Sequence, residues 1–178
     1  PTVIASQIVV ALQTIASRRS DPVEQVVVSI TSFETSSTAF NVIPQEVKIK
    51  GTVRTLDPDV RDLAEKEFLR ITELTAEAMG GSADAKFTRG YPVMSNSSEQ
   101  TEFAAKVARD VAGECAEAPL VMGGEDFAYM LEERPGAYIL LGNGDSSPVH
   151  HPKYNFNDDA IPFGCSWLVE LVEQKMPV

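Results

Sequence analysis

The sequence has little cysteine, and its two cysteines belong to no paired motif. Cys115 and Cys165 are far apart and form no Cys-x-x-Cys element. This scarcity excludes a disulfide-dense secreted scaffold and offers no recognisable redox or zinc pair. One disulfide between the two remains an alternative. The favoured interpretation is two reduced, buried thiols in a cytoplasmic protein, because disulfides are rare in that compartment.

Basic residues are also few, with 15 Lys and Arg against 26 Asp and Glu and a formal net charge of −11. A surface of that sign repels phosphate backbones, so no nucleic-acid partner is expected. No apolar run approaches the length of a membrane span, so no membrane partner is expected either. The first residues show no basic-then-apolar signal pattern. The chain instead starts at Pro1 inside an apolar-periodic segment, which predicts a cut or processed end.

The first half of the chain alternates helical and strand patterns, beginning with apolar residues at helical spacing over residues 2–17. Strict period-two alternation predicts strands over 24–33 and 47–54. Asp57-Pro58 starts a helix that Gly80-Gly81 ends, and residues 83–91 have the pattern of a third strand. Helix, strand, strand, helix, strand is the order of a ferredoxin-like module that lacks its first strand.

The second half has a different character. A helix is predicted from Ser98, followed by a short apolar run at 119–122 and a short helix at 126–133. A strand at 137–141, a long polar loop from Gly142 to Asn157 and a helix near 160–175 complete the chain. The buried face of that last helix is expected to comprise Phe163, Trp167, Leu168 and Leu171. Two candidate strands cannot form a covered sheet by themselves, which predicts that further strands come from elsewhere.

Four further segments contain residues suited to binding. His150 and His151, the only histidines, lie in the polar loop, and a neutral imidazole is the commonest metal ligand. Gly123-Gly124 precedes a helix, where the backbone can approach a ligand closely. Arg54 lies on the polar face of the second strand, and a guanidinium can hold a carboxylate in a bidentate pair. Asn41 lies just before that strand, and its amide could add one hydrogen bond.

Each of these features also has a plain structural interpretation. A histidine pair in a polar loop is most often solvent-exposed and without a binding role. A Gly-Gly step is most often a turn followed by an Asp that caps a helix. An arginine on a strand face is usually a solvated surface residue, and an asparagine before a strand is usually a turn residue. The chain also contains no nucleophile elbow, phosphate-binding loop or redox pair.

Taken together in order, the segments resemble the aminoacylase/carboxypeptidase-type metallopeptidase family, specifically its hippurate hydrolase and indole-acetyl-amino-acid hydrolase branch. The resemblance spans essentially the whole chain. Six segments, each weak alone, occur in the family's order: Ile8 to Arg18, Thr38 to Pro44, Gly51 to Thr55, Gly90-Tyr91-Pro92, Gly123 to Phe127, and Val149 to Pro152 with Phe156-Asn157-Asp158.

The resemblance implies an α/β architecture with an α+β lid. Residues 1–91 would be an incomplete ferredoxin-like lid and dimerisation domain, and residues 93–178 the C-terminal part of a catalytic domain. It matches His150, in preference to His151, to the family's C-terminal metal ligand. Asn41 and Arg54 match lid residues that reach the substrate carboxylate, and Gly123 and Gly124 match a loop lining the substrate pocket.

The implied function is metal-dependent hydrolysis of N-acyl amino acids or small peptide-like amides by a homodimer paired through its lids. Two divalent ions, of zinc, manganese, cobalt or nickel, would serve the intact enzyme. The other ligands and the general-base glutamate have no match in this chain, so it holds no catalytic residue. It is expected to bind no metal and to be inactive alone, because a catalytic metal needs about three protein ligands. The rival hypothesis is a non-catalytic dimerisation or amino-acid-binding module.

Overall fold

A computed structural model describes residues 1–176 and divides the chain into two compact units. The first unit contains Pro1–Val93 together with the short segment Met122–Gly124. The second contains Met94–Val121 and the residues from Glu125 onward. Over residues 1–176, no helix has the length and apolar character needed to cross a bilayer. The identities of the two units as lid and catalytic segment stay predictions.

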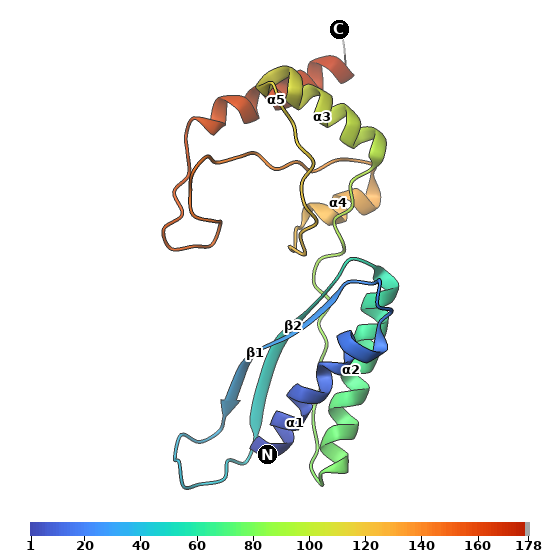
Figure 1. The fold of residues 1–178 in the computed structure, drawn as a ribbon, viewed down its shortest axis with the longest axis vertical. Helices are drawn as coiled ribbons and strands as arrows, with labels where there is room; N and C mark the ends of the chain where they lie inside the picture. Colours follow the sequence, from blue (N-terminus) through green and yellow to red (C-terminus); the bar gives the residue numbers. More distant parts are fainter. Residues whose placement is uncertain (177–178) are drawn as a thin grey trace. The chain divides into compact units, whose positions relative to one another are not determined.

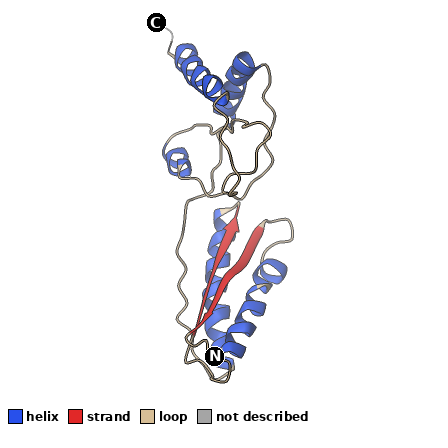
Figure 2. Cartoon of the chain, turned by 90° about the vertical axis from the view of Figure 1, so that its left-hand side faces the viewer, coloured by secondary structure: helices blue, strands red, loops and turns tan. Residues whose placement is uncertain are grey.

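A two-stranded antiparallel sheet covered by two helices forms the first unit (Figures 1 and 2). Its elements are α1 (Thr2–Leu12), a π-helical turn η1 (Ile15–Arg19), β1 (Val26–Thr35), β2 (Val47–Thr55) and α2 (Pro58–Ala78). The predicted alternation in the second strand is confirmed. Val47, Ile49 and Val53 are half-buried, whereas Arg54 is exposed. The two strands pair with a bulge between Ile30 and Ser32.

Local signals in the sequence correctly predict both ends of α2. The Asp57 carboxylate accepts hydrogen bonds from the backbone N–H groups of Asp59 and Val60, at 2.8 and 3.1 Å. These bonds satisfy two of the donors that every helix leaves unpaired at its start. Just beyond the helix, Gly80 has a φ of 76°, a left-handed conformation that glycine adopts without a steric cost.

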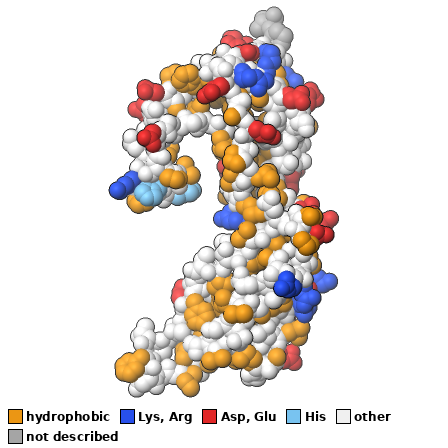
Figure 3. All heavy atoms as spheres, in the orientation of Figure 1, with side chains coloured by type: hydrophobic (Ala, Val, Ile, Leu, Met, Phe, Trp, Pro, Cys, Tyr) orange, Lys and Arg blue, Asp and Glu red, His pale blue; other side chains and the backbone are white. Residues whose placement is uncertain are grey.

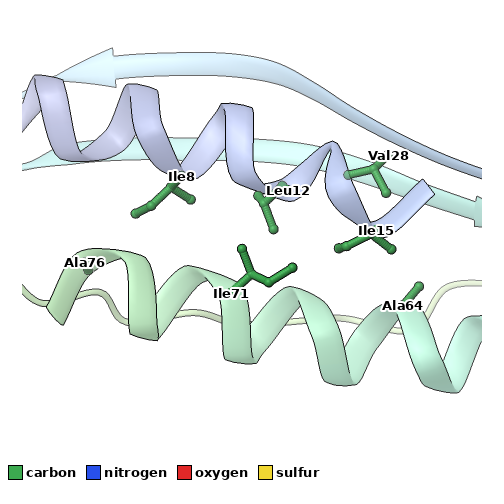
Figure 4. Packing of buried hydrophobic residues seen from close by; sticks show 7 residues of the cluster. All are labelled: Ile8, Leu12, Ile15, Val28, Ala64, Ile71 and Ala76. Atoms are coloured by element: carbon green, nitrogen blue, oxygen red, sulfur yellow. The ribbon is translucent and has the colours of Figure 1, made fainter. Parts of the chain in front are cut away.

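The core of the first unit lies where the helices and the sheet meet. Leu12 from α1 and Ile71 from α2 point toward each other in this cluster (Figure 4). Its buried members are Ile8, Leu12, Ile15, Val28, Ala64, Ile71 and Ala76. The buried residues recur every three or four positions along α1, which is why a helix with this sequence packs against the sheet on one face.

The predicted third strand, residues 83–91, is wrong as a strand assignment. Ala83, Ala85 and Phe87 are half-buried and alternate with exposed neighbours, so the period-two pattern is present in the burial. The Phe87 ring contacts Phe68 of α2 edge-on, with centroids 5.8 Å apart. A strand needs a partner ladder, and among residues 1–176 the described sheet contains only β1 and β2. The ferredoxin-like arrangement therefore stays a prediction.

The second unit consists of three helices joined by long loops, α3 (Ser98–Ala112), α4 (Phe127–Glu133) and α5 (Ala160–Lys175). The indole N–H of Trp167 in α5 donates to the Ala104 carbonyl of α3 at 3.1 Å. The strand predicted at 137–141 is wrong, and so is the burial of Phe163 and Leu168, which are 47% and 58% exposed. Among the described residues, α3 is the helix that packs against α5, so one face of α5 remains uncovered.

The two cysteines are free, as the favoured interpretation predicted. The prediction that they are buried is wrong, because Cys115 is half-buried and Cys165 is exposed. Neither thiol contributes to a disulfide constraint on the fold.

Candidate functional site

Arg54 contacts Met122, the residue that immediately precedes the glycine pair predicted to line the substrate pocket. Arg54 stands at the end of β2, paired in register with Val27 of β1, and its side chain is exposed. Its Nη1 donates to the Met122 carbonyl at 2.6 Å, across 68 residues of sequence. The guanidinium is thus held against the peptide unit that immediately precedes Gly123 and Gly124, within the first unit.

Gly124 packs closely against the ring of Tyr91. A Cβ at this position would lie 3.2 Å from the Cδ2 atom of the Tyr91 ring, which is tighter than ordinary contact. The absence of a side chain therefore lets Tyr91 pack directly against the backbone of the segment that Arg54 holds. Arg54, Tyr91 and Gly123-Gly124 form one surface, which we call the guanidinium–glycine surface.

Asn41 lies far from the guanidinium–glycine surface. It occupies a turn in which the Val42 N–H donates to the Ala39 carbonyl at 3.3 Å, within the connection between β1 and β2. Arg54 lies at the other end of β2 (Figure 1). At about 3.4 Å per residue, the strand from Val47 to Arg54 alone spans about 24 Å. One copy of the chain therefore does not bring both side chains to one carboxylate.

The two histidines lie at the tip of the loop between Gly142 and Asn157 in the second unit. Both are exposed, and their imidazoles are open to solvent in Figure 3. His150 has a φ of 69°, an uncommon conformation for a residue other than glycine. The His151 N–H donates to the Pro148 carbonyl at 3.1 Å, so His150 is the third residue of a tight turn. Backbone strain of this kind often marks a functional residue.

His151 differs from its neighbour in having a local hydrogen bond. Its Nδ1 accepts from the Lys153 N–H at 3.1 Å, and its carbonyl accepts from the Tyr154 N–H at 2.9 Å. The bond to Nδ1 ties this imidazole to its own turn. No such bond ties the His150 imidazole within the described residues. The His150 imidazole is therefore the freer of the two to bind a metal ion.

The side chains of residues 1–176 do not form a complete metal site by themselves. Over residues 1–176, no three side chains among His, Cys, Asp and Glu gather closely enough to hold an ion. A catalytic zinc-type site needs about three protein ligands, and His150 could supply one. The residues present are therefore suited to supply part of such a metal site but not all of its ligands.

A polar cluster in the second unit includes Tyr138 and Asn96, two residues that were not predicted from sequence. The Tyr138 hydroxyl donates to Glu125 Oε2 at 3.1 Å, and the Tyr138 ring lies 5.6 Å from that of Phe127. Hydrogen bonds from Asp126 and then from Tyr138 hold the pKa of Glu125 below its ordinary value. Burial and then the Glu125 carboxylate raise the pKa of Tyr138.

Asn96 holds Tyr138 in place. The Asn96 Nδ2 donates to the Tyr138 carbonyl at 2.9 Å, and the Tyr138 N–H donates to Asn96 Oδ1 at 2.8 Å. One side chain thus replaces the ladder partner that the predicted strand at 137–141 would have had. The sequence separation of 42 between Asn96 and Tyr138 explains why no local sequence signal identified Asn96.

Comparison with known proteins places the chain in a family of hydrolases. Residues 4–174 match Peptidase family M20/M25/M40. The chain is 35% identical over 176 residues to N-acetyl-L-cysteine deacetylase of Bacillus subtilis, covering 99% of this chain and 42% of the relative. It is 36% identical over 177 residues to hippurate hydrolase of Campylobacter jejuni, covering 96% and 45% of the two chains.

A solved structure gives the same result at the level of the fold. A dinuclear metal binding peptidase of Bacillus subtilis superposes with a TM-score of 0.80 at 28% identity, covering 99% of this chain and 46% of that one. The chain thus spans less than half the length of these relatives. The match includes the second unit as well as the first, which gives no support to a module built from the first unit alone.

Proposed function

The chain belongs to peptidase family M20/M25/M40, and from that premise we propose that it is the C-terminal part of a metal-dependent amidohydrolase for N-acyl amino acids. Small peptide-like amides are the second substrate class included in this proposal. The names of the two enzyme relatives, a hippurate hydrolase and an N-acetyl-L-cysteine deacetylase, denote amides of amino acids that keep a free carboxylate. A binding group for that carboxylate is the feature that this chain can supply.

The observation that carries the proposal is the guanidinium of Arg54 beside the glycine pair. Its bond to the Met122 carbonyl uses one of the five N–H donors of the side chain. Among the described residues, no carboxylate forms a salt bridge with Arg54. The remaining edge of the guanidinium can therefore take a substrate carboxylate in a bidentate pair, while Gly123 and Gly124 let the substrate backbone approach closely.

Asn41 enters the proposal through a second copy of the chain. Because it lies at the other end of the hairpin, its amide would contact a carboxylate bound by the Arg54 of another copy. This use of Asn41 goes with the proposed homodimer paired through the first unit. A monomeric enzyme would leave Asn41 without a role in binding.

His150 would contribute one metal ligand, and the remaining ligands would come from residues outside this chain. In the intact enzyme, two divalent ions of zinc, manganese, cobalt or nickel would supply an activated water for attack on the amide carbonyl. The strained turn at His150 and the engaged Nδ1 of His151 support His150 as the ligand. The chain alone is expected to hydrolyse nothing.

The test is a substrate comparison in the intact polypeptide. Arg54→Ala should raise KM for an N-acyl amino acid by roughly 10- to 100-fold, because a charge-assisted bidentate pair is lost. KM for the same substrate with its carboxylate amidated should change little. Lys48→Ala, on the same face of β2 and also exposed, serves as the matched control. Equal KM values for Arg54→Ala and the unchanged enzyme would remove Arg54 from the site.

A further inference from the structure

The loop between Gly142 and Asn157, which we call the histidine loop, is closed at its base by one asparagine side chain. The Asn143 Nδ2 donates to the Asn155 carbonyl at 2.7 Å, and the Asn157 N–H donates to Asn143 Oδ1 at 2.8 Å. The two partners lie 12 and 14 residues further along the chain. One half-buried amide therefore links the outgoing and returning segments of the loop through both of its polar atoms.

Ser146 forms a second link just above the first. Its hydroxyl donates to the Asn155 carbonyl at 3.0 Å and accepts from the Asn155 N–H at 3.4 Å. The Asn155 carbonyl thus accepts from both Asn143 and Ser146. Together the two side chains pair with the returning backbone as a strand would, although the loop contains no strand.

The tip of the loop is organised separately, by its own turns. The turns Pro148–His151 and His151–Tyr154 share His151, whose Nδ1 also accepts the Lys153 N–H. These bonds fix the conformation of the tip, including the left-handed backbone of His150. They do not fix where the tip lies, because each spans only two or three residues.

We infer that Asn143 is a positioning residue for His150: its amide closes the loop base and thereby fixes the location of the imidazole at the tip. Closing a loop removes conformational freedom from every residue inside it. Ordering the tip before a ligand arrives lowers the ordering cost that binding would otherwise carry. The role as a support for a metal ligand rests on the proposed function, whereas the closure of the loop does not.

The first experiment measures loop order in the 178-residue chain by NMR. In Asn143→Ala, the Asn157 amide should exchange at least 10-fold faster, and the heteronuclear NOE of the His150 and His151 amides should fall. Asn143→Asp retains the acceptor and loses the donor, so Asn157 should keep most of its protection. Asp145→Ala should match the unchanged chain, because the exposed Asp145 side chain forms no hydrogen bond and no ion pair within residues 1–176. Unchanged exchange and NOE values in Asn143→Ala would overturn the inference.

The second experiment measures the Kd of the intact polypeptide for Zn²⁺ and Mn²⁺. Asn143→Ala should weaken the Kd by roughly 10- to 100-fold, the usual effect of losing a group that orients a ligand. If His150→Ala weakens binding and Asn143→Ala does not, the positioning role is overturned. If neither variant weakens binding, the proposed metal role of His150 fails instead, and the NMR result alone decides whether Asn143 closes the loop.

Discussion

Different interactions stabilise the interior of each of the two units. In the first, large aliphatic side chains from α1, η1, β1 and α2 meet in one continuous core, where Leu12 and Ile15 are each 1% exposed. In the second, the buried hydrophobic side chains among the described residues are small: Ala104, Val107, Ala128 and Ala160. Several large ones lie on its surface, including Leu140, Leu141, Phe163 and Leu168.

Side chains bonded to backbone groups take the place of a large core in the second unit. Asn96, Asn143 and Trp167 each connect segments that are distant in sequence. Such bonds are directional and fix the loops that carry Tyr138 and the histidines. Burial of apolar area is stronger in sum but less specific about which atoms meet. The candidate metal ligand thus lies on a loop ordered by hydrogen bonds, whereas Arg54 is on a strand of the packed unit.

The largest change in stability is expected from truncating one leucine in each unit. Leu12→Ala should lower the free energy of unfolding of the first unit by about 3 kcal/mol, because it leaves a cavity in a packed core. Leu168→Ala, at a position 58% exposed, should cost less than about 0.5 kcal/mol. Hydrogen exchange resolved by residue gives both values, because it reports each unit separately. A cost for Leu168→Ala as large as that for Leu12→Ala would contradict the comparison.

A smaller effect is expected from removing one hydrogen-bonding side chain in the second unit. Asn96→Ala breaks both bonds to Tyr138 and should cost about 2 kcal/mol, at about 1 kcal/mol per bond. Amide exchange at Tyr138 should accelerate while the first unit stays unchanged. Asn96→Asp keeps the acceptor for the Tyr138 N–H and should recover part of the protection. If Asn96→Ala leaves Tyr138 exchange unaltered, hydrogen bonds of this kind do not order the second unit.

The smallest effect concerns the one carboxylate buried in the first unit, Glu67. Arg70 donates to both of its oxygens, at 3.2 and 2.6 Å, and Arg19 lies 3.4 Å away. The hydrogen bonds from Arg70 are the first cause of a pKa below the ordinary value, partly opposed by burial. A lowered pKa stabilises the fold above the pKa of the unfolded chain, and this contribution is lost as the pH falls through about 5 to 3.

Replacing Glu67 should therefore flatten the acid limb of the stability curve. Glu67→Gln is expected to reduce stability at pH 7 and to show a weaker dependence on pH below about 5. Glu73→Gln, exposed on the same helix, is the control and should keep the original slope. Urea unfolding followed from pH 7 to 3 measures the difference. Identical slopes for Glu67→Gln and the unchanged chain would exclude Glu67 as the titrating group.

Much of the first unit could be predicted because its signals are local. Asp57, Pro58 and Gly80 mark the ends of α2 through bonds and backbone angles that involve only neighbouring residues. Period-two alternation predicted β1 and β2, but the same alternation at 83–91 did not produce a strand. A pattern sets which side of a segment is buried, whereas a ladder also needs a partner at the right distance.

Part of the candidate site could be predicted in the same way, and part could not. The residue types at 54, 123, 124 and 150 were identified from the sequence as candidates for binding. The contact of Arg54 with Met122 spans 68 residues, and the pairing of Asn96 with Tyr138 spans 42. Neither contact has a local signature, because each depends on how separate segments fold against one another.

The sequence by itself determined the family, the net charge of −11, and the helix ends and strand faces that neighbouring residues set. Only the tertiary structure decided that Arg54 meets the glycine segment, that Asn41 lies at the far end of its hairpin, and that Asn143 closes the histidine loop. The physical reason is the sequence separation over which each kind of interaction acts. Propensity, capping and periodicity act over a few residues, whereas hydrogen bonds between distant segments form only after packing has brought their atoms within about 3 Å.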